Sequence, residues 1–301
     1  MIYSGSWLLL LRVVERNIAM PKTTKLFIIG GAEKKGRDAQ LLRFFFDLCG
    51  GAQSRITVIS CASRVPLKTG EKYQKIFFGM GAASVKVLPV LSREEANSAE
   101  AIELIKQSTG IFISGGNQVK VAATIGGTRL EAALARQFQK GVPTGGTSAG
   151  ASIMSSVMVA GGMPFTYSRR KSIRLSAGLG LIQDVIIDQH FRQRDRIYRL
   201  AAAVMSHPRN LGVGIDEDTA LYIENGTVAS VMGMGTVTVL DGVGVAYSSY
   251  ADGHAGKPIS IFGLTMHVLT DGDGFDFATR TPIQNGDIGE EITIPAEEVV
   301  Q

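Results

Sequence analysis

Cysteine is scarce in this 301-residue chain, which contains only Cys49 and Cys61. Two cysteines are too few for a disulfide framework, and they lack the C-x-x-C or Cys/His spacing of a metal site. Such usage is typical of a reducing compartment, so we expect a cytoplasmic protein. The missing ligand spacing gives no reason to expect a metal, and we expect no other cofactor. Cys61 lies at the end of an expected strand, where a buried, unreactive thiol is the usual state.

Long apolar runs and long basic runs are also lacking. No stretch approaches the roughly 20 apolar residues of a membrane-spanning helix, and Arg12 interrupts the apolar run Trp7–Leu11 too early for a signal peptide. The formal net charge is only +4, and no block of Lys and Arg forms a basic arm. We therefore expect neither a membrane nor a nucleic acid as partner. Residues 1–19 are interpreted as an extension or alternative start before a single domain over residues 20–301.

Short apolar runs alternate with helical segments in the first half of the chain. They span 26–31, 55–63, 85–90, 110–116 and the stretch that ends at Ser148. Runs that are apolar on both faces are typical of central strands in a parallel sheet covered by helices on each side. The pairs Ser92/Glu95 and Thr128/Glu131 match the capping box that begins a helix. The fold class predicted is therefore α/β, with a mostly parallel sheet flanked by helices.

The second half is richer in strands. Apolar runs span 184–191, 212–233 and 236–242. The pair Asn225-Gly226 between two alternating runs predicts a tight hairpin turn, and we expect a second hairpin across Asp271–Gly274. These features predict antiparallel strands added to the sheet in the C-terminal part.

The segment Gly146–Gly150 reads GTSAG and matches the G-x-S-x-G nucleophile elbow. We predict a strand ending near Thr144, a helix over Ala151–Val159, and an exposed hydroxyl on Ser148 between them. The flanking glycines fit because side chains there would collide with the strand and the helix at so sharp a turn. A small-residue turn that only packs closely, or that binds an anion, is the alternative interpretation.

Backbone amides near this serine are candidate donors to the oxyanion of a tetrahedral intermediate. The Ala149 amide opens the expected helix, whose dipole favours negative charge. We expect a second donor from Gly115 or Gly116, which end the preceding strand.

A serine nucleophile needs a base, and the chain has four histidines. His190 follows an apolar strand, so we place it at the carboxyl edge of the sheet, where Ser148 is also expected. His207 precedes a proline at an expected helix end, where capping explains it better. His254 and His267 lie in the late β region and are interpreted as structural or exposed.

The orienting acid stays open on spacing alone. The best source is the run Asp216–Asp218, with Asp188 and Asp195 as rivals, and a solvated acidic turn is the alternative. Arg192, Arg196 and Arg199 recur at helical spacing, and Arg194 lies between them. They predict one cationic helix face beside the base, suited to an acidic substrate or else merely solvated.

Taken together, these segments resemble the cyanophycinases, serine peptidases related to aspartyl dipeptidases of the peptidase E type. The resemblance rests on FIIGGAE, SCASRVPLKTGEKYQKIF, GIFISGGNQ, GTSAGAS, DQHFRQRDRIYRL and GIDEDTAL, which follow in the same order between Lys25 and Asp241. It implies Ser148 as nucleophile, His190 as base and Glu217 as acid. The substrate-binding positions that it implies are Gln118, Asp188, Gln189, Arg194, Arg196 and Arg199.

The resemblance also implies a class I amidotransferase-like or peptidase E-like fold, a homodimer and an enzyme without a metal. The substrate it implies is cyanophycin, a polyaspartate that carries an arginine on each β-carboxyl, cleaved to β-aspartyl-arginine dipeptides. Two alternatives stay open. One is an aspartyl or isoaspartyl dipeptidase of the peptidase E type, and the other is a non-catalytic binding module of amidotransferase-like architecture.

Overall fold

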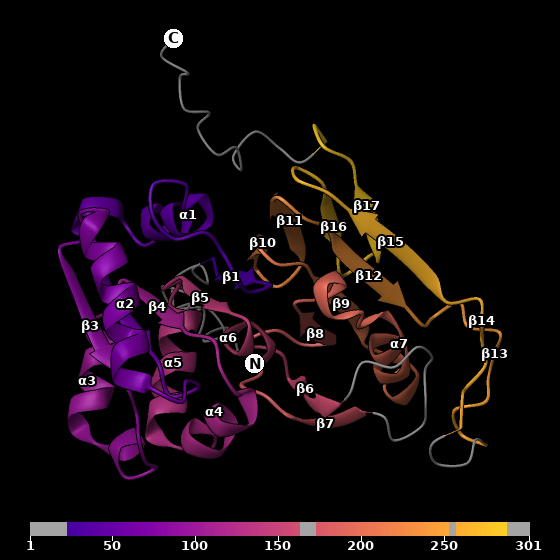
Figure 1. Cartoon of the computed structure of the whole chain (residues 1–301), viewed down its shortest axis with the longest axis horizontal. Helices are drawn as coiled ribbons and strands as arrows, with labels where there is room; N and C mark the ends of the chain where they lie inside the picture. Colours follow the sequence, from indigo (N-terminus) through magenta and orange to yellow (C-terminus); the bar gives the residue numbers. More distant parts are fainter. Residues whose placement is uncertain (1–22, 163–172, 253–256, 288–301) are drawn as a thin grey trace, which may run out of the picture.

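The structure is a computed structural model that describes residues 23–162, 173–252 and 257–287 (Figure 1). The expected extension over residues 1–19 lies outside the described residues. The boundary of the single domain predicted over residues 20–301 stays a prediction.

Five parallel strands form one half of a nine-stranded sheet, in the order β1, β5, β4, β2, β3. Their bounds are β1 Lys25–Ile29, β2 Arg55–Ile59, β3 Ser84–Leu88, β4 Gly110–Ile113 and β5 Thr144–Thr147. These are the five runs predicted from the sequence. Every residue of β4 and β5 is buried, because these two strands lie in the interior of the parallel half and are covered on both faces.

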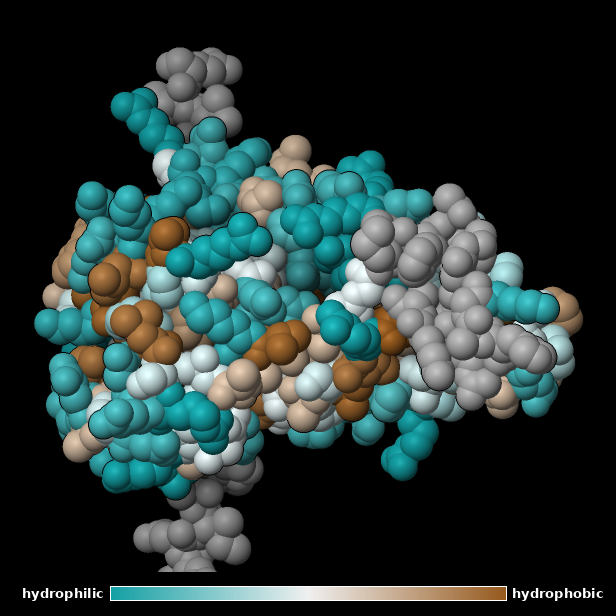
Figure 2. All heavy atoms as spheres, turned by 60° about the horizontal axis from the view of Figure 1, so that its bottom comes forward, coloured by the Kyte–Doolittle hydropathy of each residue, from teal (hydrophilic) through white to brown (hydrophobic). Residues whose placement is uncertain are grey.

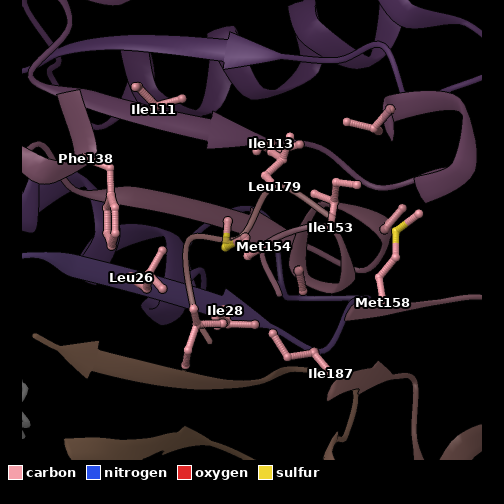
Figure 3. Close-up of a cluster of buried hydrophobic side chains, with 14 of the residues drawn as sticks. Leu26, Ile28, Ile111, Ile113, Phe138, Ile153, Met154, Met158, Leu179 and Ile187 are labelled. Carbon is pink, nitrogen blue, oxygen red and sulfur yellow. The ribbon is translucent and has the colours of Figure 1, made fainter. Parts of the chain in front are cut away.

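Helices cover both faces of the parallel strands. Successive side chains of β1 point to opposite faces and are all apolar after Lys25, so both faces need cover. Phe27 and Ile29 pack with aromatic residues of α1 and α2, whereas Leu26 and Ile28 point into a second cluster that includes α3 and α5. Figure 3 shows part of this second cluster. The helices are α1 Gln40–Leu48, α2 Pro66–Gly79, α3 Ala99–Gln107, α4 Gln118–Ile125 and α5 Arg129–Gln139.

One of the two predicted capping boxes begins a helix. The Thr128 hydroxyl accepts a hydrogen bond from the Glu131 amide, and α5 starts there, so this prediction is confirmed. The Ser92/Glu95 prediction is wrong as an α-helix start, because Glu95 opens only a short 3₁₀ turn, η2 Glu95–Asn97. Helix α3 is capped instead by Ser98, whose hydroxyl accepts from the Ala101 amide.

Antiparallel strands from the C-terminal half extend the same sheet beyond β1. They are β10 Thr219–Glu224, β11 Val228–Gly233, β16 Gly274–Asp276 and β17 Thr281–Ile283. Strands β10 and β11 are joined through Asn225 (φ 51°) and Gly226 (φ 68°), and two such positive φ angles are what a type I′ turn requires. The predicted turn is therefore confirmed.

A second sheet contains four strands in the order β8, β9, β12, β15. Strands β8 (Val185–Gln189) and β9 (Leu211–Ile215) are parallel and joined through helix α7 (Ile197–Ser206), while β12 (Val237–Asp241) and β15 (Thr265–Leu269) are antiparallel. The hairpin predicted across Asp271–Gly274 is wrong. Strand β15 belongs to this sheet and β16 to the larger one, so the segment carries the chain from one sheet to the other.

Smaller elements complete the described chain. They are α6 Ala149–Ser152, η1 Gly51–Gln53, η3 Arg192–Arg194, the ribbon of β6 Val157–Gly162 with β7 Ile173–Ala177, and the ribbon of β13 Tyr247–Ser248 with β14 Ile261–Phe262.

One buried apolar cluster connects the two sheets. It contains Ile28 and Ile113 of the larger sheet together with Ile187 and Val213 of the smaller one. The outer surface is different in character, since the face in Figure 2 is mostly hydrophilic with hydrophobic side chains in small groups. No helix in the described ranges has the length and apolar character needed to cross a membrane. The predicted α/β class with late antiparallel strands is confirmed.

Candidate active site

Ser148 forms the corner between β5 and α6. Its backbone lies at φ 54° and ψ −112°, a conformation that a residue with a side chain rarely adopts, and its side chain stays partly exposed. The helix predicted over Ala151–Val159 is wrong, because α6 is a single turn and β6 begins at Val157. The chain leaves the helix to bond with a later segment, where the Leu179 amide donates to the Ile153 carbonyl.

The glycines around this corner have the steric role predicted for them. A Cβ on Gly146 would lie 2.5 Å from the Gly150 carbonyl oxygen, and a Cβ on Gly150 would lie 2.0 Å from the Ile113 carbonyl oxygen. Real Cβ atoms do not approach backbone that closely, so only glycine fits at both positions. The interpretation that side chains would collide with strand and helix is confirmed.

His190 lies directly against the serine. Its Nε2 is 2.9 Å from the Ser148 Oγ, and its backbone amide donates to the Gly30 carbonyl over 2.8 Å. The Gly31 backbone is packed so tightly on the imidazole that an added Cβ would lie 2.4 Å from the ring Cε1. The residue follows β8 as expected, but β8 belongs to the four-stranded sheet. The prediction of a shared sheet edge is therefore wrong, and the two side chains meet because the two sheets are packed together.

Among the candidate acids, Glu217 is the one that contacts the imidazole. Its Oε1 lies 2.6 Å from the His190 Nδ1. Asp216 points the other way, is buried, and accepts from the amides of Arg192 and Thr236. Asp218 accepts from the Lys34 amide.

The two rival acids lie elsewhere. Asp195 is exposed, and Asp188 is fully buried against arginines. A carboxylate on Nδ1 fixes the imidazole tautomer that leaves Nε2 free to accept the serine proton.

The pKa of His190 is lowered from its ordinary value of 6.5. Burial is the main cause, because it disfavours the charged imidazolium, and the positive charge of Arg194 acts in the same direction. The hydrogen bond to Glu217 opposes both effects. The ring is therefore mainly neutral at pH 7, which is the state a general base needs.

The arginines after His190 do not form one helix face, so that prediction is wrong. Arg192 and Arg194 lie on the 3₁₀ turn η3, and Asp195 follows it with a left-handed φ of 47°, so α7 starts only at Ile197. Arg192 and Arg194 are exposed, whereas Arg196 and Arg199 are buried.

The buried arginines are bound to Asp188. The Arg199 Nε and Nη2 reach the two carboxylate oxygens over 2.7 and 2.5 Å, and the Arg196 Nη1 lies 3.3 Å from Asp188 Oδ1. Arg196 Nη1 also donates to the Gln189 carbonyl oxygen and to its Oε1. The ion cluster thus lies directly behind Gln189, whose Oε1 is 3.4 Å from the Ser148 Oγ.

The remaining predicted site residues lie around the same corner. A Cβ on Gly115 would lie 3.2 Å from the Ser148 Cβ, so the Gly115 backbone adjoins Ser148. Within the described residues, the amides of Gly115 and Gly116 donate no backbone hydrogen bond. Gln118 begins α4, and its side-chain amide donates to the Val159 carbonyl of β6.

Two residues near Ser148 were not among the site residues predicted from the sequence. Glu33 is a buried carboxylate that accepts from the Thr147 hydroxyl, and Gln193 accepts from the Glu217 amide. For Glu33 a signal existed, because a charged residue follows the apolar run FIIGG after a single alanine. For Gln193 the sequence holds no comparable signal, since a glutamine between arginines is equally typical of a solvated turn.

The other histidines and the cysteines fit their structural interpretations. His207 ends α7, and His267 packs on the Phe275 ring within the late strands. His254 lies outside the described residues. Cys61 is buried, which raises the pKa of its thiol to about 11 and keeps it protonated.

No group of three or more potential metal ligands occurs in the described part of the chain. A cavity of about 520 Å³ lies at the opposite, amino-terminal edge of the strands, bordered by Thr24, Gln139, Asp184 and Arg280. It contains none of the predicted site residues.

The site has the arrangement of serine hydrolases. A partly exposed serine lies on a strained strand-to-helix corner, a histidine contacts its hydroxyl, and a glutamate contacts the histidine. Comparison with known proteins narrows this class. Residues 26–231 match the sequence profile of Peptidase family S51. The chain belongs to peptidase family S51 and is a serine peptidase.

The relatives of known name agree with this assignment. A cyanophycinase of Synechococcus elongatus is 40% identical over 253 residues, which cover 84% of this chain and 79% of the relative. A cyanophycinase of Geminocystis herdmanii is 36% identical over 261 residues, covering 86% and 96% of the two chains. The resemblance to cyanophycinases inferred from the sequence is confirmed.

Solved structures support the fold. A peptidase from an acI-B1 Actinobacterium superimposes with a TM-score of 0.61 at 24% identity, over 84% of this chain and 97% of the other. A peptidase E protein of Listeria monocytogenes gives a TM-score of 0.50 at 18% identity, over 71% and 100% of the two chains. At these identities the likeness concerns the fold alone, and it fits the predicted peptidase E-like architecture.

Proposed function

We propose that this chain is an exopeptidase that hydrolyses cyanophycin to β-aspartyl-arginine dipeptides, with Ser148, His190 and Glu217 as its catalytic triad. The observation that carries the proposal is the continuous chain of hydrogen bonds from the Ser148 Oγ through both ring nitrogens of His190 to the Glu217 Oε1. The relatives named cyanophycinase support the choice of polymer.

The proposed reaction follows from the positions of these groups. The Ser148 Oγ attacks the carbonyl carbon of the scissile bond while its proton passes to the His190 Nε2. The amides of Ala149 and of Gly115 or Gly116 stabilise the resulting oxyanion. Collapse breaks the carbon–nitrogen bond, and His190 returns the proton to the leaving amine. A water molecule activated by His190 then attacks the acyl-enzyme and releases Ser148.

The substrate offers a carboxylate and a guanidinium in each repeat, so its site needs charges of both signs. Arg194 is exposed next to His190 and is the proposed partner of a substrate carboxylate. Arg196 is proposed to act on the substrate through Gln189, because its guanidinium is buried and its Nη1 donates to the Gln189 Oε1. In this proposal Asp188 and Arg199 support Gln189 from behind, while Gln118, whose side-chain amide is bound to the Val159 carbonyl, contacts the substrate.

The experiment is incubation of the purified protein with cyanophycin, followed by chromatographic detection of dipeptide. We expect β-aspartyl-arginine from the wild-type protein and none from Ser148→Ala. Rapid cleavage of ordinary aspartyl dipeptides without release from the polymer would favour the dipeptidase instead. Inactivity on both substrates, together with no labelling by a serine-reactive phosphonate, would favour the silent binding module.

We also propose that the active form is a cytoplasmic homodimer. Light scattering during size-exclusion chromatography tests the dimer and should give twice the chain mass of 32.1 kDa. A mass equal to one chain would contradict it.

A further inference from the structure

Glu33 is a buried carboxylate with a full set of partners. Its exposed fraction is 3%. Its Oε2 accepts from the Thr147 hydroxyl over 2.5 Å, and its Oε1 accepts from the Tyr73 hydroxyl over 2.6 Å. The Lys35 ammonium lies 2.9 Å from the same Oε1. The carboxylate thus joins the loop after β1, helix α2 and the last residue of β5.

The charge state of Glu33 favours strong bonds. Burial alone would raise the pKa of the carboxyl, but Lys35 and the hydrogen bonds from Thr147 and Tyr73 outweigh burial and lower it. Burial and the nearby carboxylate raise the pKa of Tyr73, so the phenol stays protonated and donates. An ionised carboxylate that accepts from two hydroxyls forms charge-assisted bonds, about twice as strong as neutral ones.

Thr147 transmits this attachment to the nucleophile. It directly precedes Ser148 and pairs with Ile29 of β1, while the Ser148 amide donates to the Ile29 carbonyl over 3.0 Å. The peptide unit before the strained corner is therefore held by a backbone bond on one side and by the Glu33 carboxylate on the other. A strained backbone persists only where its surroundings over-determine it.

We propose that Glu33 is a positioning residue, which acts through Thr147 to keep Ser148 in the conformation that places its hydroxyl on His190. The proposal rests on the catalytic role proposed for Ser148. A buried ion pair is a poor source of stability compared with packed apolar side chains. A charged network tied to the residue next to the nucleophile is better explained by a need for fixed geometry.

The test is the second-order rate constant with which a fluorophosphonate inactivates the protein, because this rate reports the reactivity of Ser148 without any substrate-binding site. Glu33→Gln and Thr147→Val each remove the charged contact while keeping side-chain size. We expect both to react about 10- to 100-fold more slowly, the scale of a small misplacement of reacting groups. Thr147→Ser restores the hydroxyl and should react within about threefold of the wild type.

Asp241→Asn is the matched control. Asp241 is also a buried carboxylate paired with a cation, Arg280, over 2.7 Å, but it lies at the end of β12 in the smaller sheet. This variant should lose comparable stability and keep the wild-type inactivation rate. If Glu33→Gln does not fold, the comparison of inactivation rates between Thr147→Val and Thr147→Ser tests the proposal without it.

Wild-type rates in Glu33→Gln and Thr147→Val would overturn the proposal, as would an equal slowing in Asp241→Asn. Absence of labelling in the wild-type protein itself would instead contradict the role of Ser148.

Discussion

Ser148, His190 and Glu217 are linked by two contacts through the imidazole, with Ser148 Oγ 2.9 Å from His190 Nε2 and His190 Nδ1 2.6 Å from Glu217 Oε1. Because the three are proposed to act as a catalytic unit, we expect Ser148→Ala or His190→Ala to lower kcat by about 10⁶, and Glu217→Gln by about 10⁴. Steady-state kinetics on cyanophycin checks this. A full loss in Asp216→Asn with none in Glu217→Gln would show that the wrong acid had been chosen.

Arg194 should shape the pH dependence of this relay. Its charge helps to lower the pKa of His190, so activity should persist below pH 6.5 and fall only as the imidazole becomes protonated. Arg194→Gln removes a like charge, which raises the pKa of His190 and moves the acid limb to higher pH.

The rate of phosphonate inactivation as a function of pH measures this shift. Because Arg194 is exposed, added salt should screen its charge and make the acid limbs of the wild type and Arg194→Gln more alike. Arg192→Gln is the control, since that guanidinium faces Asp216. An unchanged acid limb in Arg194→Gln would show that Arg194 does not act on the base.

The loop after β1 packs against the imidazole of His190, the proposed base. Gly31 (φ 106°) leaves no room for a Cβ against the His190 ring, so Gly31→Ala should push the imidazole away from Ser148 and lower kcat by about 10². Gly36→Ala is a close control, because Gly36 lies in the same loop with φ 124° and nothing within 4 Å of an added Cβ. Equal activity in the two variants would contradict this role of Gly31.

Elements with strong local patterns could be predicted from the sequence. The five parallel strands and the Asn225-Gly226 turn follow from apolar runs and from backbone preferences that the residues carry themselves. The short length of helix α6 could not be predicted, because residues 153–156 form backbone hydrogen bonds with residues 178–182 instead of continuing the helix. The arginine spacing predicted one continuous helix face, which does not form because Asp195 adopts a left-handed conformation that separates η3 from α7.

The site residues show the same division. The turn around Ser148 could be predicted from the sequence because its flanking positions have room only for glycine. His190 is predicted as the base because it follows an apolar strand, and it does contact Ser148, but that strand belongs to the other sheet, since spacing along the chain does not reveal which strands pair. Glu33 contacts Thr147 across 114 positions of sequence, so only the folded arrangement reveals it.

The candidate site lies where two sheets meet, so its integrity depends on the whole molecule. Ser148 comes from the nine-stranded sheet and His190 from the four-stranded one, and one apolar cluster fills the space between them. We therefore expect a single unfolding transition in urea, with circular dichroism and phosphonate reactivity lost together. Loss of reactivity well before loss of secondary structure would indicate that the two sheets separate independently.

If His190 activates Ser148 at the junction of the two sheets, the serine should react with a fluorophosphonate only while the imidazole is present. Peptide mass spectrometry after treatment with this reagent locates the adduct. We expect one adduct, on the peptide that contains Ser148, and its disappearance in His190→Ala. An adduct on another residue, or an equally rapid adduct on Ser148 without His190, would contradict it.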